Sequence, residues 1–313
     1  MKLLLLFFKL IRWPNLVFIA LAQYLFYYCI QYKIYTSASV YPMLNNIYLS
    51  LLCFSSICIA AAGYIINDYF DVNIDIINKP HKLIIGKFIK PRWAMVWHWI
   101  LSVTGIAIGF YIDYKTPTSL IGLSNIICVL LLFGYSVSLK RKLLSGNIVI
   151  SLLTAWTILV IPFAEWNALF NNTQLRQIYI DVDFKKLYRI GFLYTGFSFI
   201  ISLIREAIKD MEDVEGDRQY GCKTMPIVWG LRTTKVFTAV WIIVLIGVLA
   251  IVQLYTAQLG WWASVSYCIL LIMLPLGIAL KKLLTAQTAK TFHALSSLIK
   301  LIMLAGIVSM IFF

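Results

Sequence analysis

Long apolar stretches alternate with short polar segments along the whole chain. The apolar stretches lie at residues 14–32, 47–66, 94–113, 117–136, 148–166, 187–204, 235–255, 262–280 and 292–313. Each is about 20 residues long, which is the length that an α-helix needs to cross a hydrocarbon layer of about 30 Å. The pattern predicts an all-α polytopic membrane protein with nine transmembrane helices, and we expect residues 1–313 to form a single domain.

The composition agrees with this pattern, because 61% of the residues are hydrophobic and only 13% are charged. A water-soluble domain with this composition would expose large contiguous apolar surfaces. The six cysteines show no metal-binding spacing, so we predict neither disulfides nor a zinc site.

The basic residues gather in alternate connections between the predicted helices. The N-terminal tail and the segments 67–93, 137–147, 205–235 and 281–291 hold 20 Lys or Arg residues, against 5 in the other connections. Basic loops stay in the cytoplasm, so we expect a cytoplasmic N-terminus and an integral protein of the cell inner membrane. The net charge of +14 is then explained by topology and membrane lipids, and no basic patch interleaved with aromatic residues predicts nucleic-acid binding.

Two short windows hold nine of the thirteen acidic residues. One is NDYFDVNID at 67–75, directly after the second apolar stretch, and the other follows the sixth stretch at 206–217. Both windows fall on the cytoplasmic side in the topology above. The aspartates repeat one spacing of +3 and +4 and lie at Asp68, Asp71, Asp75, Asp210, Asp213 and Asp217.

This spacing predicts one acidic face wherever the helix continues beyond the membrane, because residues i, i+3 and i+7 of an α-helix fall within an arc of about 60°. Like charges at a low-dielectric boundary repel each other unless cations lie between them. Carboxylate oxygens favour hard divalent cations such as Mg²⁺, which binds one or two carboxylates together with phosphate oxygens. The two windows therefore indicate Mg²⁺ sites that hold a diphosphate and stabilise it as a leaving group.

Three other interpretations of the acidic windows differ in what they predict. An EF-hand is excluded because Ile76 stands in place of the turn glycine and Lys82 in place of the bidentate glutamate. The carboxylates as merely solvated loop residues remain an alternative. A membrane transporter with coupling carboxylates is another, although such carboxylates are expected near the bilayer midplane.

Basic residues close to both windows are suited to phosphate groups that Mg²⁺ does not neutralise. They include the segment YSVSLKRKLLSGN, which follows the fourth apolar stretch. The candidates for substrate binding among them are Lys79, Lys82, Arg141, Arg218 and Lys223.

The two aspartate-rich motifs and the tyrosine-lysine segment between them resemble those of the UbiA superfamily of intramembrane prenyltransferases. The resemblance covers nearly the whole chain and implies nine helices around a central lipid-facing cavity. It implies transfer of a prenyl group from a polyprenyl diphosphate to a lipophilic acceptor, with Mg²⁺ as cofactor. Metal binding is implied for Asn67, Asp68, Asp71, Asp75, Asp210, Asp213 and Asp217, with Asn67 also contacting the substrate.

The resemblance further implies that Asp71, Asp75, Asp213 and Asp217 are catalytic. Tyr135 and Lys140 match the tyrosine-lysine element and are also implied to be catalytic, with a place near the diphosphate and the reactive carbon. We expect the allylic diphosphate to ionise and the acceptor to attack the resulting carbocation-like carbon, while apolar helix faces exclude water.

The sequence around the motifs is most similar to sequences of the archaeal branch of this superfamily, which prenylates a glyceryl phosphate. INKP at 77–80 and KDMEDVEGD at 209–217 carry this likeness, which indicates geranylgeranylglyceryl phosphate as acceptor. An aromatic acceptor such as 4-hydroxybenzoate or a quinone precursor remains the alternative. The segment HKLIIG at 81–86 departs from the RPLPSG found in many relatives, which puts the acceptor and the diphosphate affinity in question.

Overall fold

The computed structural model describes residues 2–78 and 83–313. The longer helices are α2 (Trp13–Leu25), α4 (Asn46–Asn78), α5 (Pro91–Lys115), α6 (Ile121–Val137), α7 (Ser145–Asn171), α9 (Phe184–Glu212), α12 (Leu231–Gln258), α14 (Leu274–Thr285) and α15 (Ala289–Val308). The shorter ones are α1 (Lys2–Leu10), α3 (Tyr32–Ser37), α8 (Thr173–Ile178), α10 (Val214–Gln219), α11 (Met225–Val228) and α13 (Trp262–Cys268). A π-helical turn joins α2 to α3 and another joins α13 to α14, so each pair forms one continuous helical run.

The predicted all-α membrane architecture is confirmed. Eight helical runs in the described part of the chain are long and apolar enough to cross a membrane, and Ile121–Val137 is a shorter apolar helix. The nine predicted spans match these eight runs and the shorter helix. The largest differences are the ends of α4 and α9, which extend beyond the predicted 66 and 204 to Asn78 and Glu212.

Helix α6 begins at Ile121, four residues after the predicted start at 117, because Asp113 caps it. The Asp113 carboxylate accepts hydrogen bonds from the backbone N–H groups of Ile121 (3.2 Å) and Gly122 (2.7 Å). The Thr118 hydroxyl also donates to Asp113 at 2.7 Å. These bonds satisfy N–H groups that a helix start leaves without intrahelical partners, so the segment before Ile121 is held as a turn.

The chain forms two compact units, and helices α7 and α9 contribute residues to both. Unit 1 comprises Met1–Ser138 and Trp156–Tyr194, and unit 2 comprises Leu139–Ala155 and Thr195–Phe313. The expected organisation of residues 1–313 as a single domain stays a prediction.

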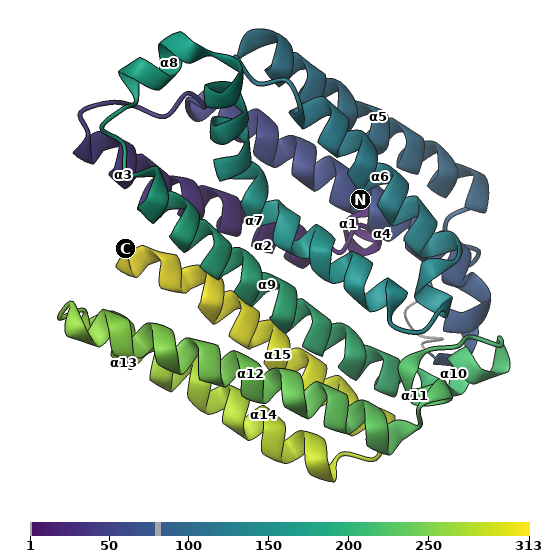
Figure 1. Cartoon of the computed structure of the whole chain (residues 1–313). Coiled ribbons are helices and arrows are strands. Elements are labelled where there is room, and N and C mark those ends of the chain that lie inside the picture. The colour runs from purple at the N-terminus through teal and green to yellow at the C-terminus, as the bar shows by residue number, and fades with distance from the viewer. Residues whose placement is uncertain (1, 79–82) are drawn as a thin grey trace. The chain divides into compact units, whose positions relative to one another are not determined.

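In unit 1, helices α4, α5 and α6 pack against one another (Figure 1). Their interface contains a buried polar cluster in which Ser55 donates to the carbonyl of Gly105 at 2.7 Å. The Asn125 amide donates to both Ser55 (2.9 Å) and the Gly105 carbonyl (3.0 Å). Small residues let the backbones approach closely, and the shared hydrogen bonds satisfy the polar side chains within an apolar interior.

A second buried cluster in unit 1 surrounds Glu165 of α7, whose residue exposure is 1%. Its carboxylate accepts hydrogen bonds from the Gln31 amide (3.1 Å) and the Tyr35 hydroxyl (3.3 Å). Backbone N–H groups of Met43 and Leu44 donate to it at 3.2 and 3.1 Å. Four donors offset the cost of burying this carboxylate, which therefore fixes the connection between α3 and α4.

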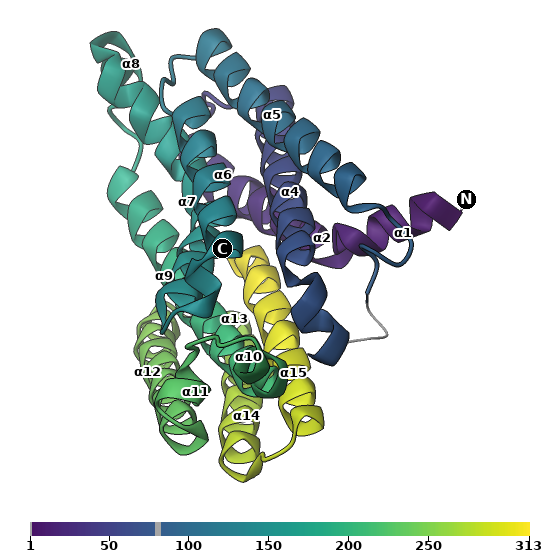
Figure 2. The same cartoon turned by 90° about the vertical axis from the view of Figure 1, so that its right-hand side faces the viewer.

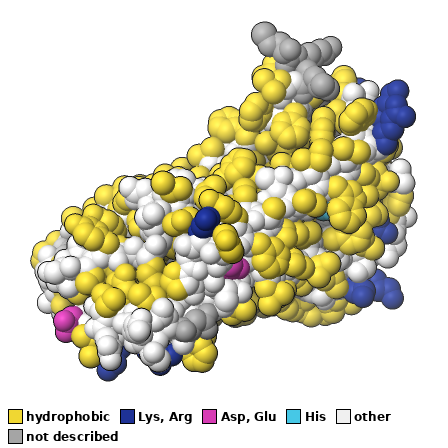
Figure 3. All heavy atoms as spheres, turned by 90° about the horizontal axis from the view of Figure 1, so that it is seen from above, with side chains coloured by type: hydrophobic (Ala, Val, Ile, Leu, Met, Phe, Trp, Pro, Cys, Tyr) yellow, Lys and Arg dark blue, Asp and Glu magenta, His cyan; other side chains and the backbone are white. Residues whose placement is uncertain are grey.

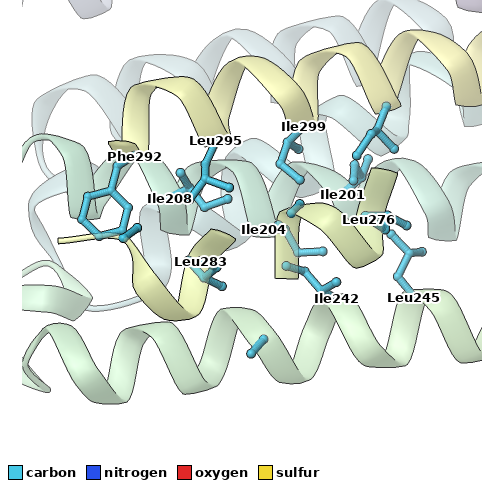
Figure 4. Packing of buried hydrophobic residues seen from close by; sticks show 14 of the residues in the cluster. Ile201, Ile204, Ile208, Ile242, Leu245, Leu276, Leu283, Phe292, Leu295 and Ile299 are labelled. Carbon is cyan, nitrogen blue, oxygen red and sulfur yellow. The ribbon is translucent and has the colours of Figure 1, made fainter. Parts of the chain in front are cut away.

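Unit 2 has an aliphatic core formed by α9, α12, α14 and α15 (Figure 4). Helix α14 packs against both α12 and α15, and the two views show these helices side by side (Figures 1 and 2). The core residues labelled in Figure 4 are Ile201, Ile204, Ile208, Ile242, Leu245, Leu276, Leu283, Phe292, Leu295 and Ile299.

Large apolar side chains also cover the outer faces of the helices. On α12, for example, Val236, Ile243, Ile251 and Leu254 are 55–70% exposed. Figure 3 shows hydrophobic side chains over much of one face, with few charged side chains among them. Exposed apolar surface of this extent suits lipid, so the protein is an integral membrane protein.

The Glu165 cluster yields a stability prediction. We expect Glu165→Ala to lower the thermal unfolding temperature in detergent by at least about 5 °C, because each buried donor left without an acceptor costs about 1–3 kcal/mol. Asp183→Asn is the matched control, since Asp183 is exposed and its carboxylate accepts a local bond from the Lys186 N–H (2.9 Å) that the Asn oxygen can also accept. An unchanged unfolding temperature for Glu165→Ala would show that these bonds do not stabilise unit 1.

Candidate active site

The first acidic motif lies on the last turns of α4. Because α4 continues without a break to Asn78, its aspartates Asp68, Asp71 and Asp75 share one helical face. This confirms the prediction of an acidic face for the first motif. Asn67 precedes Asp68 on the same helix, and all four side chains are half-buried.

A small apolar core supports this end of α4. Ala61 and Ile65 of α4 pack in it with Leu10 and with Ile85 and Ile89 of the connection to α5. Both isoleucines are nearly fully buried. The core therefore fixes the α4 end that carries the motif.

The HKLIIG segment at 81–86 differs from the RPLPSG of many relatives, and its described residues 83–86 have a structural role. Ile85 anchors it in the core, and Gly86 adopts φ +85°, a conformation that suits glycine because it has no side chain. The Gly86 N–H donates to the carbonyl of Ile89 at 2.9 Å and closes the turn. Lys79 and Lys82, predicted to bind substrate, lie outside the described residues.

Arg12 contacts the first aspartate of this motif. It lies between α1 and α2 in a left-handed backbone conformation, and its guanidinium is 2.6 Å from the Asp68 carboxylate. The same guanidinium lies 5.1 Å from the centre of the Tyr64 ring, and Asn15 donates to the Tyr64 hydroxyl at 3.2 Å. Burial lowers the pKa of Arg12, but the interactions with Asp68, Tyr64 and Asp75 together outweigh this effect and raise the pKa above its ordinary value.

Sequence reasoning assigned Arg12 only to membrane orientation. The signal that could have singled it out is Pro14, which favours the first turn of a helix and so places Arg12 at a helix start.

The second acidic motif does not share the geometry of the first. Helix α9 ends at Glu212, Asp213 lies between α9 and α10, and Asp217 belongs to α10. The condition for one acidic face, a helix that continues through the motif, is therefore not met for Asp210, Asp213 and Asp217. Crowded like charges and a glycine in MEDVEGD (211–217) weaken the helix here.

A glycine-based turn closes α10 directly after Asp217. Gly221 adopts φ +66°, its N–H donates to the Arg218 carbonyl (3.2 Å), and the Cys222 N–H donates to the Asp217 carbonyl (2.9 Å). This is the Schellman arrangement that ends many helices. It fixes the backbone of Asp217, while the side chain of Arg218 is exposed.

Asn147, which sequence reasoning did not identify, contacts the first aspartate of the second motif. Its side-chain amide, near the start of α7, donates to the Asp210 carboxylate at 2.8 Å. Asn147 is 6% exposed, so this bond lies largely away from solvent. No local sequence pattern predicts this contact, because Asn147 and Asp210 are 63 positions apart.

The predicted basic segment lies beside the second motif within unit 2. Leu139–Arg141 forms a short 3₁₀ turn, and the Lys223 N–H donates to the carbonyl of Arg141 at 2.7 Å. Gly146 makes the turn possible, since a Cβ there would lie 2.7 Å from the Cα of Lys140. The structure thus places the turn that contains Lys140 and Arg141 against the backbone of Lys223, which belongs to the segment that follows Asp217.

Tyr135 belongs to α6 in unit 1, whereas Lys140 belongs to unit 2. A shared role for this tyrosine and lysine stays a prediction.

The donor set fits Mg²⁺ in kind, because it consists of carboxylate and amide oxygens. In the described parts of the chain, no three His, Cys, Asp or Glu side chains converge on one metal position.

Comparisons with known proteins identify the family. The UbiA prenyltransferase family profile matches residues 34–302, which include both motifs. A digeranylgeranylglyceryl phosphate synthase from Methanosphaera stadtmanae is 27% identical over 85% of this chain and 89% of the relative. The synthase of that name from Methanoregula boonei is 32% identical over 73% of this chain and 70% of the relative.

Solved structures show the same fold. A digeranylgeranylglyceryl phosphate synthase structure matches with a TM-score of 0.60 at 23% identity, covering 99% of each chain. A UbiA homologue from Archaeoglobus fulgidus, solved with GPP and Mg²⁺, matches with a TM-score of 0.55 at 13% identity over 97% of this chain and 99% of that chain. By its family profile and its relatives, this chain belongs to the UbiA prenyltransferase family and is an integral membrane prenyltransferase.

Proposed function

We propose that this protein transfers a prenyl group from a polyprenyl diphosphate to a glyceryl phosphate acceptor, with geranylgeranylglyceryl phosphate as the preferred acceptor. The two curated relatives described above both carry the name of a synthase of this class. We place the active site at the cytoplasmic face of the cell inner membrane, since the basic connections that flank both motifs belong on that side.

The observation that carries the proposal is the backbone hydrogen bond from the Lys223 N–H to the Arg141 carbonyl, 2.7 Å long. It holds the turn that contains Lys140 and Arg141 against the backbone of Lys223, in the segment that follows Asp217. We infer that basic and acidic side chains of this region bind an anion and a cation side by side. A metal-bound diphosphate has this chemistry, because its oxygens accept from Lys and Arg and also ligate Mg²⁺.

We assign Mg²⁺ binding to Asp71 and Asp75 in the first motif and to Asp213 and Asp217 in the second, with Asn67 as a further oxygen donor. When bound, Mg²⁺ neutralises charge that develops on the departing diphosphate. Arg218 and the two predicted lysines of the first loop, Lys79 and Lys82, add positive charge for the diphosphate.

In the reaction, the bond between the allylic carbon and the diphosphate oxygen breaks, and its electron pair leaves with the diphosphate. The acceptor hydroxyl oxygen then bonds to that carbon, forms an ether and releases its proton. Lys140 and Arg141 hold the leaving group, and Tyr135 is assigned a place near the reactive carbon. Apolar helix faces exclude water, which would otherwise capture the allylic carbon and give a prenyl alcohol.

A phosphorylated acceptor also explains the number of basic residues around the acidic motifs, since it brings a second anion to the site. The acceptor is lipophilic as well, so it reaches the site from the membrane rather than from solvent.

Metal dependence is the first prediction. Chelation of Mg²⁺, or replacement of Asp71, Asp75, Asp213 or Asp217 by Ala, is expected to reduce turnover at least about 10²-fold, the scale of losing one preorganised electrostatic group. Turnover is measured as prenylated product formed by purified protein. Glu215→Gln is the matched control, because Glu215 is an exposed acidic residue in the same segment and should retain activity. Full activity in both Asp71→Ala and Asp213→Ala would support the solvated-loop interpretation instead.

The basic turn gives a second prediction. Gly146→Ala would force the backbone at Lys140 to move, so we expect it to raise the KM for the prenyl diphosphate about 10-fold. A displacement of about 1 Å at a positioning residue typically has effects up to 10²-fold. Gly134→Ala is the control, because nothing lies within 4 Å of a Cβ at that position. Equal KM values for the two variants would contradict the assigned role of the turn.

The acceptor is tested by competition. With geranylgeranyl diphosphate fixed as donor, initial rates are compared for geranylgeranylglyceryl phosphate and 4-hydroxybenzoate by mass spectrometry of the products. We expect a rate at least about 10-fold higher for the glyceryl phosphate, since the basic residues bind its phosphate. Prenylation of the aromatic compound alone would overturn this acceptor.

A further inference from the structure

The two acidic motifs differ in backbone geometry, but each makes the same type of contact. Each motif begins with an aspartate whose carboxylate contacts a side chain from the start of the preceding long helix. Arg12, directly before α2, contacts Asp68 near the end of α4 at 2.6 Å. Asn147, near the start of α7, contacts Asp210 near the end of α9 at 2.8 Å.

The two contacts occupy equivalent places in their helix pairs. A long helix that is followed by an antiparallel one has its start beside the end of its successor. Residues at those two ends therefore meet, although Arg12 and Asp68 are 56 positions apart and Asn147 and Asp210 are 63 apart. The contact recurs within unit 1 and within unit 2, which makes an accidental pairing a poor explanation.

Both contacts occupy carboxylate oxygens of the first aspartates. The guanidinium of Arg12 neutralises the charge of the Asp68 carboxylate. This pairing weakens the attraction of that carboxylate for a metal ion. The Asp210 Oδ2 accepts the amide hydrogen of Asn147. Each contact thereby fixes the orientation of the first aspartate of its motif.

We propose that Arg12 and Asn147 are positioning residues that hold Asp68 and Asp210 in place, and that these two aspartates support the motifs rather than binding Mg²⁺ directly. This inference rests on the proposed function, because it assigns the other aspartates to the metal. Arg12 and Asn147 touch neither diphosphate nor acceptor in this assignment. Their effect passes through the carboxylate that each contacts.

The test measures metal binding without turnover. Mn²⁺ is titrated into purified protein with geranyl diphosphate present and followed by electron paramagnetic resonance. Arg12→Ala and Asn147→Ala are expected to weaken Mn²⁺ binding about 10-fold or more, as loss of supporting partners does in other metal sites. Arg12→Lys should recover part of the loss, since it keeps a point charge beside Asp68. Unchanged Mn²⁺ binding in both alanine variants would overturn the proposal.

Double variants separate positioning from direct substrate binding. If Arg12 acts through Asp68, adding Arg12→Ala to Asp68→Asn should change Mn²⁺ binding and kcat less than about 2-fold further, and Asn147→Ala should behave likewise with Asp210→Asn. Independent, multiplying effects would show that Arg12 or Asn147 acts on the ligand itself. That result would overturn the positioning role.

Two matched controls break contacts between the same helices without touching an aspartate. Tyr64→Phe removes the 3.2 Å bond from Asn15 but keeps the ring beneath Arg12. Ser202→Ala removes the 3.3 Å bond from Ser202 of α9 to Thr154 of α7. Both should bind Mn²⁺ within about 2-fold of the unmodified protein. Losses as large as those of the alanine variants would mean that helix packing, not aspartate orientation, is responsible.

Should the alanine variants fail to fold, as judged by size-exclusion chromatography, Arg12→Gln and Asn147→Leu carry the same test with larger side chains that preserve more of the packing. Failure of the proposed function is distinguishable. A protein that forms no prenylated product, yet whose Mn²⁺ binding depends on Arg12 and Asn147, contradicts the function and supports the inference. Normal product formation together with Mn²⁺ binding that does not depend on Arg12 or Asn147 supports the function and contradicts the inference.

Discussion

The high free-energy cost of placing charge in a hydrocarbon layer dominates this structure. A spanning segment must satisfy its own backbone hydrogen bonds, so the chain crosses the membrane as helices. Acidic residues are then confined to helix ends or to fully bonded interior positions. The motif of α4 takes the first solution and the four-donor cluster around Glu165 takes the second.

Once acidic residues gather at a helix end, their mutual repulsion has to be managed. The first motif keeps a continuous helix, and a guanidinium offsets the charge of Asp68. The second motif interrupts the helix at Asp213, and a glycine turn closes α10 after Asp217. The backbone thus reaches two different solutions, while the contact to the first aspartate from the preceding long helix is common to both.

Much of the fold is accessible from the sequence, because membrane spans depend on long apolar runs whose signal is local. The first acidic face follows from spacing alone, since α4 continues as a regular helix. The break at Asp213 does not, because helix propensity in an acidic, glycine-containing run is a weak guide against the tertiary context. The roles of Arg12 and Asn147 depend on contacts between helices more than 50 positions apart, which spacing along the chain cannot reveal.

The late start of α6 has the same kind of cause. Hydropathy predicts an apolar run from residue 117, but the carboxylate of Asp113 accepts from the N–H groups of Ile121 and Gly122 and so sets the helix start. A capping side chain outside the apolar window is invisible to an average over that window. Buried loop residues such as Ile85 are also missed, because a single buried isoleucine in a basic loop leaves no periodic pattern.

The most direct test of the account is an anomalous diffraction map from crystals grown with Mn²⁺ and a non-reactive prenyl diphosphate analogue. The account predicts Mn²⁺ peaks bound by oxygens of Asp71 or Asp75 and of Asp213 or Asp217, with the diphosphate beside them. Asp68 should still contact Arg12, and Asp210 should still contact Asn147. Diphosphate bound without a metal peak at either motif would contradict the central claim that these aspartates hold the metal for prenyl transfer.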